Sequence, residues 1–484
     1  MKKKFKAAVS LLCAAAMALS LAACGSKKVA TTEISVWTYY NGDQLESFET
    51  RDGLLCFTKL VDTFNETVGQ EKHIHVTTDS QGTVNDLETN VMDAAEGKVG
   101  ASAMPNIFAA YADTAYALDQ MGQLVDLRGY LTDTERAAYI DDYISEGDFD
   151  GTGSMKIFPV AKSTELMFFN DTDWQKFASA TGATYDDLST IEGLVETAGK
   201  YYEWTDAQTD TPDDGKALFG RDAMANYMLI GAQQLGCTIF QVENGKMTVG
   251  LDEATARTLW DNYYVPFVKG WFAATGRFRS DDVKTGNILG YVGSNSSATF
   301  FPGQVTLDDD ATHDIEMKVL PSPQFAGSKG VAVQQGAGMV VTKGTEEEIE
   351  ASVEFLKWLT QPENNIAFAV GSGYLPVTKA ANSMDAIKSS GLELTSNMEQ
   401  ILAGAVAEVQ NNTLYTPKAF EGGSSARKVL EYSMADLAAA DRTTVEERIA
   451  AGQSAAEAEA EFLTDDYFEQ WYEDISAQLS AYEG

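Results

Sequence analysis

Short β-rich segments alternate with helical patterns along most of this chain, and this alternation constrains the fold more than any other feature. Residues 33–37 and 73–76 have the pattern of strands, and 104–108 has that of the entry to a third strand. Helical patterns lie between them, at 54–61 and 86–96. Strands that alternate with helices form βαβ units, so we predict an α/β fold on mainly parallel sheets.

Chain length then indicates how many cores to expect. The chain has 484 residues, whereas single hydrophobic cores stop growing at about 250–300 residues. No internal repeat is apparent that would favour a solenoid or a propeller. We therefore expect two cores rather than one.

The N-terminus has the pattern of a bacterial secretion signal. Four lysines precede an apolar run at 7–23, which is short for a membrane span. The letters LAAC at 21–24 resemble the lipobox of bacterial lipoproteins. That resemblance implies a signal peptide over 1–23, lipidation of Cys24 and a tether over 24–31, so that the folded part is anchored at the extracytoplasmic face of the cell membrane. The alternative is an ordinary secreted protein with Cys24 at this position by chance.

Charge excludes several classes of partner. The formal net charge is −37 at pH 7. A surface with this much negative charge repels nucleic acid and anionic lipid headgroups. We therefore expect no nucleic-acid partner. No later segment is apolar and long enough to cross a bilayer, and the membrane contact we expect is the lipid anchor alone.

The sequence carries no recognisable motif for catalysis or for a cofactor. There is no G-x-S-x-G elbow, P-loop or dinucleotide fingerprint. His73 and His75 share a strand face without an evident third ligand, and the acidic loop 205–220 lacks the ligand spacing of an EF-hand. We therefore predict a protein that is not an enzyme, with no catalytic residue, no metal and no cofactor. Cys56 and Cys237 could form a disulfide, but we favour two separate thiols.

The most specific pattern lies at 336–381, which reads GAGMVVTKGTEEEIEASVEFLKWLTQPENNIAFAVGSGYLPVTKAA. Thr345 and Glu348 form a capping box for a helix, and Gly371 is placed to cap the next helix. This segment resembles the C-terminal signature of family 1 extracellular solute-binding proteins, the maltose-type and glycerol-3-phosphate-type partners of ABC importers. Four further stretches fit the same family in order: 34–42, 105–127, 158–170 and 285–301.

The resemblance implies a two-lobed fold of the periplasmic-binding-protein type. Two interleaved α/β lobes would be joined by hinge strands and would close on the ligand. Residues 32–158 and 292–342 would form lobe 1, and residues 159–291 and 343–484 would form lobe 2. The resemblance also implies a monomer that captures a mono- or oligosaccharide and delivers it to the transmembrane subunits of an ABC permease.

Candidate ligand-binding residues follow from the chemistry of sugars and from the resemblance. Sugars are uncharged and well hydrated, so their sites combine hydroxyl, amide and carboxylate groups with aromatic faces. Serines at a strand end can instead cap a helix, and strand-edge hydroxyls can bond their own backbone. An arginine suits a phosphate or a carboxylate. The predicted ligand-binding residues are Tyr39, Ser163, Thr164, Trp271, Ser294, Ser297, Gly338, Tyr374 and Arg427.

The ligand class stays open between a carbohydrate and other polar solutes. Glycerol-phosphate binders carry an acidic residue directly after the tyrosine matched by Tyr111, where this chain has Ala112 and then Asp113. They also have a tyrosine near 82–85, where Val84 is the nearest residue. These departures favour a saccharide, with a surface glycan tether and a glycosidase as alternative functions. Further aromatic candidates for the site are Trp37, Tyr40, Trp204 and Tyr227.

Overall fold

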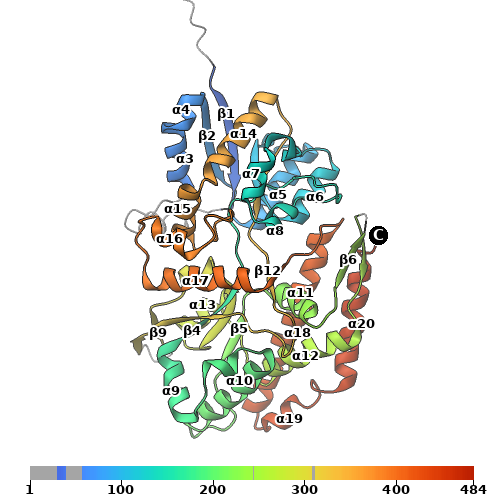
Figure 1. Ribbon diagram of the computed structural model, residues 1–484. Helices are drawn as coiled ribbons and strands as arrows, with labels where there is room; N and C mark the ends of the chain where they lie inside the picture. The colour runs from blue at the N-terminus through green and yellow to red at the C-terminus, as the bar shows by residue number, and fades with distance from the viewer. Residues whose placement is uncertain (1–29, 40–56, 244, 308–310) are drawn as a thin grey trace, which may run out of the picture.

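The computed structural model describes residues 30–39, 57–243, 245–307 and 311–484. The predicted signal peptide and Cys24 lie outside the described residues, as do Tyr40 and Cys56. Figure 1 shows an upper and a lower lobe, each built around its own sheet. The predicted α/β fold is therefore confirmed. Across the part of the chain that is described, no helix is long and apolar enough to span a membrane.

The upper lobe is built on a four-stranded sheet in the order β13-β3-β1-β2. β1 pairs in parallel with β2 and β3, as the βαβ pattern predicts, and β13 runs antiparallel to β3. Ile34, Val36 and Phe108 of these strands are buried beneath the helices. The upper-lobe elements are β1 (Thr32–Thr38), α3 (Phe57–Glu66), α4 (Val68–Lys72), β2 (Ile74–Ser80), α5 (Val84–Glu96), β3 (Ile107–Ala110), α6 (Ala112–Gln120), η1 (Leu127–Tyr130), α7 (Asp133–Ala138), α8 (Asp141–Ser145), β13 (Gly338–Val341) and α14 (Glu346–Leu359).

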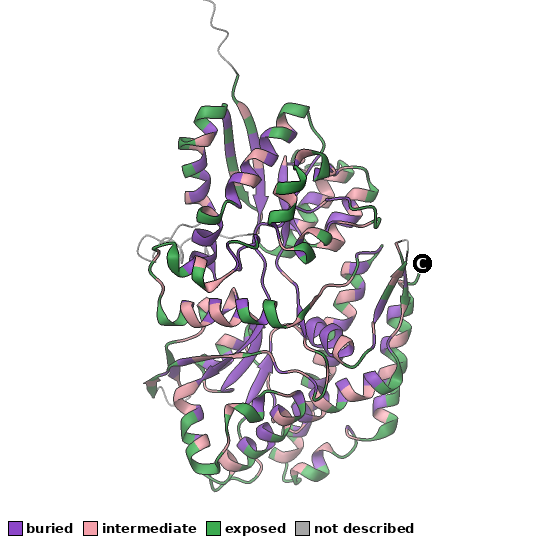
Figure 2. Ribbon diagram, in the orientation of Figure 1, coloured by how far each residue is buried: buried purple, intermediate pink, exposed green. Residues whose placement is uncertain are grey.

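The lower lobe has a second four-stranded sheet, in the order β11-β4-β8-β5. Here β4 is antiparallel to both β11 and β8, and only β5 and β8 are parallel, so this sheet is mixed. Its strand elements are β4 (Glu165–Asn170), β5 (Phe219–Arg221), β8 (Gly290–Ser294) and β11 (Met317–Pro321). Figure 2 shows the central strands of both sheets as buried, while the edge strands β2 and β11 and the outer faces of the helices include exposed residues.

Helices surround the lower sheet, and three two-stranded ribbons lie beside it. The helices are α9 (Asp171–Thr181), η2 (Tyr185–Leu188), α10 (Ile191–Asp206), α11 (Met224–Gln234), α12 (Glu253–Val268), α13 (Arg279–Lys284), η3 (Ser297–Phe300), α16 (Met384–Ser389), α17 (Ser396–Asn411), α18 (Gly423–Ala450), α19 (Ala455–Glu459) and α20 (Asp465–Ser480). α15 (Pro362–Ser372) lies between the lobes and buries Phe368 in the upper core and Ile366 in the lower one. The ribbons are β6 (Phe240–Glu243) with β7 (Lys246–Val249), β9 (Gln304–Thr306) with β10 (Thr312–Asp314), and β12 (Val331–Val333) with β14 (Thr413–Tyr415).

Two segments pack in the opposite lobe to the one the resemblance implies. The predicted lobe 1 includes 292–342, but β11 within it pairs with β4 of the lower sheet. The predicted lobe 2 includes 343–484, but α14 packs on β1 and buries Phe355 and Leu356 in the upper core. The chain therefore returns to the upper lobe later than predicted, at β13, and leaves it through α15, whose Phe368 still packs in the upper core.

The ends of α14 and α15 follow from local sequence. The capping box is confirmed: the Thr345 side chain accepts from the Glu348 amide, and the Glu348 carboxylate accepts from the Thr345 amide at 2.8 Å. The predicted cap at Gly371 is wrong, because α15 continues to Ser372 and Gly373 is the left-handed cap, with φ 76°. The Ser372 hydroxyl donates to the carbonyl of Phe368 at 2.6 Å, a bond that suits a residue still within the helix.

Three crossing segments, at 158–164, 333–338 and 373–377, lie side by side between the lobes. Ser163 and Gln335 exchange two backbone hydrogen bonds, at 2.8 and 3.0 Å. Lys162 forms an isolated bridge with Leu375 in the same way. These pairings make one narrow hinge region from segments that are far apart in the sequence.

Candidate functional site

A pocket of about 390 Å³ lies between the two lobes, beside the crossing segments. This volume is within the usual range for small-molecule sites, about 300–1,000 Å³. The upper lobe contributes Val84, Asn85, Glu88, Tyr111, Asp113, Thr114 and Glu146. The lower lobe and the hinge contribute Ala223, Asn226, Leu229, Ile230, Phe240, Val333, Gln334, Gln335, Tyr415, Thr416, Pro417, Phe420, Gly423, Ser424, Arg427, Lys428, Glu431 and Tyr432.

The first turns of four helices surround this pocket. Two belong to the upper lobe, α5 and α6, and two to the lower lobe, α11 and α18. The amides at a helix start have no partner within the helix, so they need a partner from elsewhere. In α11 that partner is Glu431, whose carboxylate accepts from the amides of Met224 at 3.3 Å and Ala225 at 2.8 Å.

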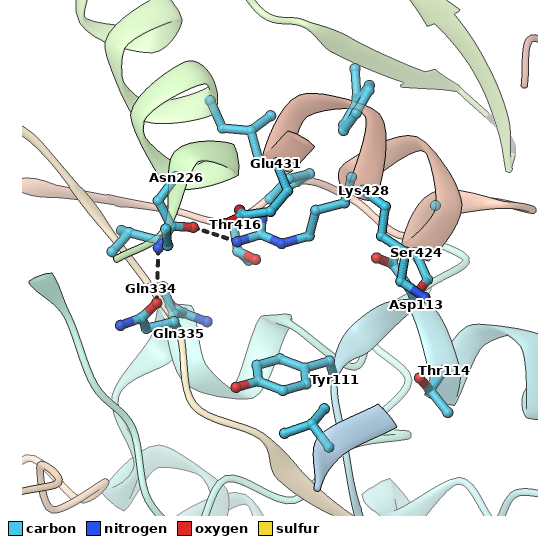
Figure 3. Close-up of a pocket in the computed structure, with 18 of the residues that line it drawn as sticks. Tyr111, Asp113, Thr114, Asn226, Gln334, Gln335, Thr416, Ser424, Lys428 and Glu431 are labelled. Carbon is cyan, nitrogen blue, oxygen red and sulfur yellow. Dashed lines mark hydrogen bonds between the residues drawn. The ribbon is translucent and has the colours of Figure 1, made fainter. Parts of the chain in front are cut away.

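Asn226 is the centre of a hydrogen-bond network on the lower wall of the pocket. It is 1% exposed, and its Oδ1 accepts from the guanidinium of Arg427. Its Nδ2 donates to Oε1 of Glu165 at 2.7 Å and to Oε1 of Gln335 at 3.0 Å (Figure 3). Burial raises the pKa of Glu165, against the opposing effect of Arg221 nearby. The network holds Arg427 and the hinge residue Gln335 in fixed positions at the pocket wall.

Two aromatic rings present exposed surface to the pocket from opposite lobes. Tyr111 of the upper lobe is 40% exposed, and Figure 3 shows its ring pointing into the open space of the pocket. Tyr432 of the lower lobe is 54% exposed. Although the ring of Tyr111 is exposed, its hydroxyl lies within the cleft, where burial and nearby Tyr374 both raise its pKa. Phe240 and Phe420 also line the pocket and pack edge to face, with ring centroids 5.2 Å apart.

The ionisable side chains of the pocket are mostly acidic. Four carboxylates line it, against two cations, Arg427 and Lys428. Burial raises the pKa of Asp113 to about 6; Arg427 lowers that pKa, and Glu88 and Glu146 raise it. Within the described ranges, no group of three or more His, Cys, Asp or Glu is arranged to hold a metal ion. The pocket can therefore accept hydrogen bonds from a ligand through carboxylates and cover its apolar faces with aromatic rings.

Comparison with known families identifies the family of this chain. Residues 59–393, more than half of the chain, match the family model described as bacterial extracellular solute-binding protein. The chain belongs to this family. Its members act as solute-binding proteins of ABC transporters and not as enzymes, and the family is extracellular. A search of curated proteins returns no match.

Solved structures of solute-binding proteins have the same fold. The UgpB protein of Mycobacterium tuberculosis, in complex with glycerophosphocholine, has a TM-score of 0.66 at 16% identity, covering 93% of this chain and 99% of its own. The cyclic alpha-maltosyl-1,6-maltose binding protein of Arthrobacter globiformis has a TM-score of 0.64 at 16% identity, covering 93% and 100%. The galacto-N-biose-/lacto-N-biose I-binding protein of Bifidobacterium longum has a TM-score of 0.63 at 14% identity, covering 94% and 99%.

Of the predicted ligand-binding residues, Arg427 lines the pocket of this solute-binding protein. The others are at its margins or away from it. Ser163 is buried and pairs through its backbone with Gln335, whose side chain lines the pocket. Trp271 packs against Gly199 and lies under Lys269, at the edge of the lower core. Gly338 is paired with Ala110 inside the upper sheet.

Asn295 brings three of the predicted segments together beside the hinge. Its Oδ1 accepts from the amide of Thr164 at 2.7 Å, and its Nδ2 donates to the carbonyl of Gly373. Asn295 lies between Ser294 and Ser297, and the Ser297 hydroxyl donates to the Ser294 carbonyl at 2.8 Å. The hydroxyl of Thr164 is buried without a hydrogen-bond partner.

Tyr374 connects this cluster to the upper lobe. Its ring stacks on Phe368 with centroids 6.1 Å apart, and its hydroxyl lies 3.5 Å from that of Tyr39. Tyr374 is half-buried and near enough to Tyr111 to raise the pKa of that hydroxyl. The predicted residues Tyr39 and Tyr374 therefore contact each other near Tyr111 without lining the pocket.

Several pocket residues were not predicted, although the sequence holds a signal for two of them. Tyr111 and Asp113 directly follow β3, and α/β proteins bind ligands beyond the carboxyl ends of their strands. Asp113 and Val84, which count as departures from the glycerol-phosphate pattern, both line the pocket. Asn226 and Tyr432 carry no such signal, because only the packing of α11 against α18 brings them to the cleft. The aromatic candidate Tyr227 is 3% exposed and belongs to the lower core.

Proposed function

We propose that this solute-binding protein captures a carbohydrate, a mono- or short oligosaccharide, in the pocket between its lobes and delivers it to an ABC permease. The observation that carries this proposal is that exposed tyrosine side chains and many hydrogen-bonding groups line the same pocket. Tyr111 and Tyr432 offer apolar faces from opposite lobes. Carboxylate, amide and guanidinium groups between them replace the hydrogen bonds that sugar hydroxyls make with water.

Ligand capture would work by closure of the two lobes. A ligand that contacts both walls is bound more tightly by the closed form than by the open form, so binding shifts the population toward closure. The crossing segments at 158–164, 333–338 and 373–377 would supply the hinge. A surface glycan tether, the alternative function, would need no such motion.

Lipidation of Cys24 would keep this carrier beside its permease. Each buried methylene of an acyl chain contributes about 0.8 kcal/mol, and stable anchoring needs two chains. We expect the full chain to fractionate with membranes in a bacterial host and Cys24→Ser to be released into the soluble fraction. Equal membrane retention of both would contradict lipidation at this cysteine.

A ligand panel tests the carbohydrate proposal. Thermal unfolding of the mature chain is measured with mono- and oligosaccharides, because a ligand that binds the native state raises Tm by mass action. Small-angle scattering with and without the best sugar then measures compaction. We expect at least one saccharide to raise Tm and to reduce the radius of gyration. Release of reducing sugar during incubation would favour a glycosidase instead.

A second ligand class, glycerol phosphate and related phosphate-bearing solutes, is favoured by one observation, the presence of Arg427 in the pocket. An arginine fork binds phosphate oxygens well. In this chain, however, the guanidinium is already hydrogen-bonded to Asn226, and carboxylates outnumber cations around it. Adding glycerol 3-phosphate to the same panel separates the two ligand classes.

A further inference from the structure

The carboxylate of Asp113, from the upper lobe, rests against the first residue of α18 in the lower lobe. A Cβ added to Gly423 would lie 2.5 Å from Oδ1 of Asp113, so a side chain at this position would push the carboxylate away from the helix. Figure 3 shows Asp113 directly beside Ser424, the next residue of the helix. α6 of the upper lobe therefore touches α18 of the lower lobe at this point.

Asp113 faces the positive end of α18, on the lower wall of the pocket. α18 runs for 28 residues from Gly423, and a helix N-terminus carries the equivalent of about half a positive charge. Arg427 is one turn further along the same helix and also lines the pocket. Without a carboxylate of the protein beside them, a helix start and an arginine on one wall would suit a phosphate, sulfate or carboxylate group of a ligand.

In this chain the upper lobe supplies its own anion to that wall. Asp113 lies closest, and Glu88 and Glu146 lie near enough to raise its pKa, whereas Arg427 lowers it. An anionic ligand would have to displace the Asp113 carboxylate from the start of α18 or accept a like charge beside it. An uncharged ligand meets neither cost, and its hydroxyl groups can donate to the carboxylate.

We propose that Asp113 is the specificity-determining residue of this cleft, which excludes anionic solutes by occupying the positive end of α18 and accepts hydrogen bonds from uncharged polyhydroxyl ligands. The choice of an uncharged sugar as the preferred ligand rests on the proposed function. The exclusion of anions does not, since it depends only on Asp113, α18 and Arg427.

The test is anion binding by Asp113→Asn, which keeps the size of the side chain and removes its charge. Inorganic sulfate and glucuronate are titrated into the mature protein by calorimetry, since both probes stay ionised between about pH 5 and about pH 8. We expect Asp113→Asn to bind at least one of them about tenfold more tightly than the unmodified chain. Asp62→Asn, an exposed change of equal charge in the upper lobe, should show no gain.

Acidification of the unmodified chain provides a second readout. Protonation of Asp113 should have the same effect as the substitution, so anion affinity should rise from about pH 8 to about pH 5 in the unmodified chain more than in Asp113→Asn. The other charged groups of the pocket are the same in both proteins: Arg427, Lys428 and Glu431 on α18, Glu88 on α5 and Glu146 after α8. A parallel rise in both proteins would assign the effect to other groups.

Each outcome decides the proposal. Equal anion affinity of the unmodified chain and Asp113→Asn, or no anion binding by either, overturns the role of Asp113. If no saccharide binds but Asp113→Asn gains anion affinity, the carbohydrate proposal fails and the role of Asp113 stands. If a saccharide binds but Asp113→Asn gains no anion affinity, the role of Asp113 fails and the carbohydrate proposal stands.

Discussion

The ammonium group of Lys162 is paired with the carboxylate of Glu146, and the two side chains are 0% and 4% exposed. Lys162 also donates to the carbonyl of Gly336 at 2.8 Å, and Gln334 donates to Glu146 at 3.2 Å. This buried pair therefore joins the first crossing segment, the second crossing segment and the end of α8. It fixes the part of the hinge that borders the pocket, since Glu146 and Gln334 both line it.

Removing one partner of this pair should be strongly destabilising. Lys162→Met leaves the Glu146 carboxylate buried and unpaired, for which we expect a loss of about 3–5 kcal/mol in the free energy of unfolding. Replacing both, with Lys162→Met and Glu146→Leu, should recover much of that loss. Chemical denaturation measures all three. Lys98→Met, which breaks an exposed pair with Asp93, should cost less than about 1 kcal/mol.

Gly338 tests whether a predicted ligand-binding glycine serves packing instead. A Cβ there would lie 2.2 Å from Cγ2 of Ile157 and 3.0 Å from the carbonyl oxygen of Phe158. Gly338→Ala should therefore lower the free energy of unfolding by about 1–3 kcal/mol through overpacking. Gly303→Ala, where nothing lies within 4 Å, is the matched control. If Gly338→Ala leaves stability intact but abolishes ligand binding, the glycine is needed for the ligand.

Glu408 predicts a pH dependence of stability. It is 4% exposed on α17, its Oε1 has no hydrogen-bond partner, and burial raises its pKa to about 8 from an ordinary 4.5. Between these values the native state keeps a proton that the unfolded chain has lost. Stability should therefore fall as pH rises through this window, by up to about 1.4 kcal/mol per pH unit, and level off above it.

The substitution Glu408→Gln isolates this contribution. Urea denaturation from about pH 5 to about pH 8 should show a flatter dependence for the variant than for the unmodified chain. Glu393→Gln, an exposed change on the same lobe, should leave the dependence unchanged. Identical slopes for all three proteins would mean that Glu408 ionises normally in the folded state.

Tyr374 remains a predicted contact of the ligand at the rim of the pocket. Its ring is half-buried on Phe368, so Tyr374→Ala should cost less than the about 3–5 kcal/mol typical of a fully buried aromatic ring. We expect sugar affinity, measured by calorimetry on the folded protein, to fall about tenfold or more. A large fall in Tm with sugar affinity preserved in the folded fraction would show that Tyr374 serves packing and not ligand binding.

The sequence predicts elements whose signals are local, and it does worse where distant segments meet. The capping box of Thr345 and Glu348 lies within four residues, and the structure contains it. Whether α14 belongs to the upper or the lower lobe depends on which sheet its apolar face packs against. The spacing of its apolar residues does not distinguish the two sheets. The pocket residues Asn226 and Tyr432 come from α11 and α18, so their proximity is created by tertiary packing alone.

The measurement that tests the central claim most directly is calorimetric titration of the best saccharide into three variants: Tyr111→Ala, Tyr432→Ala and Phe278→Ala. The first two remove the rings of the pocket, and the third removes an aromatic ring of similar exposure, 53%, away from it. Because aromatic rings stack against the faces of sugars, Kd should rise about tenfold or more for each pocket variant. It should stay unchanged for Phe278→Ala. Unchanged affinity in both pocket variants would contradict a carbohydrate site in this cleft.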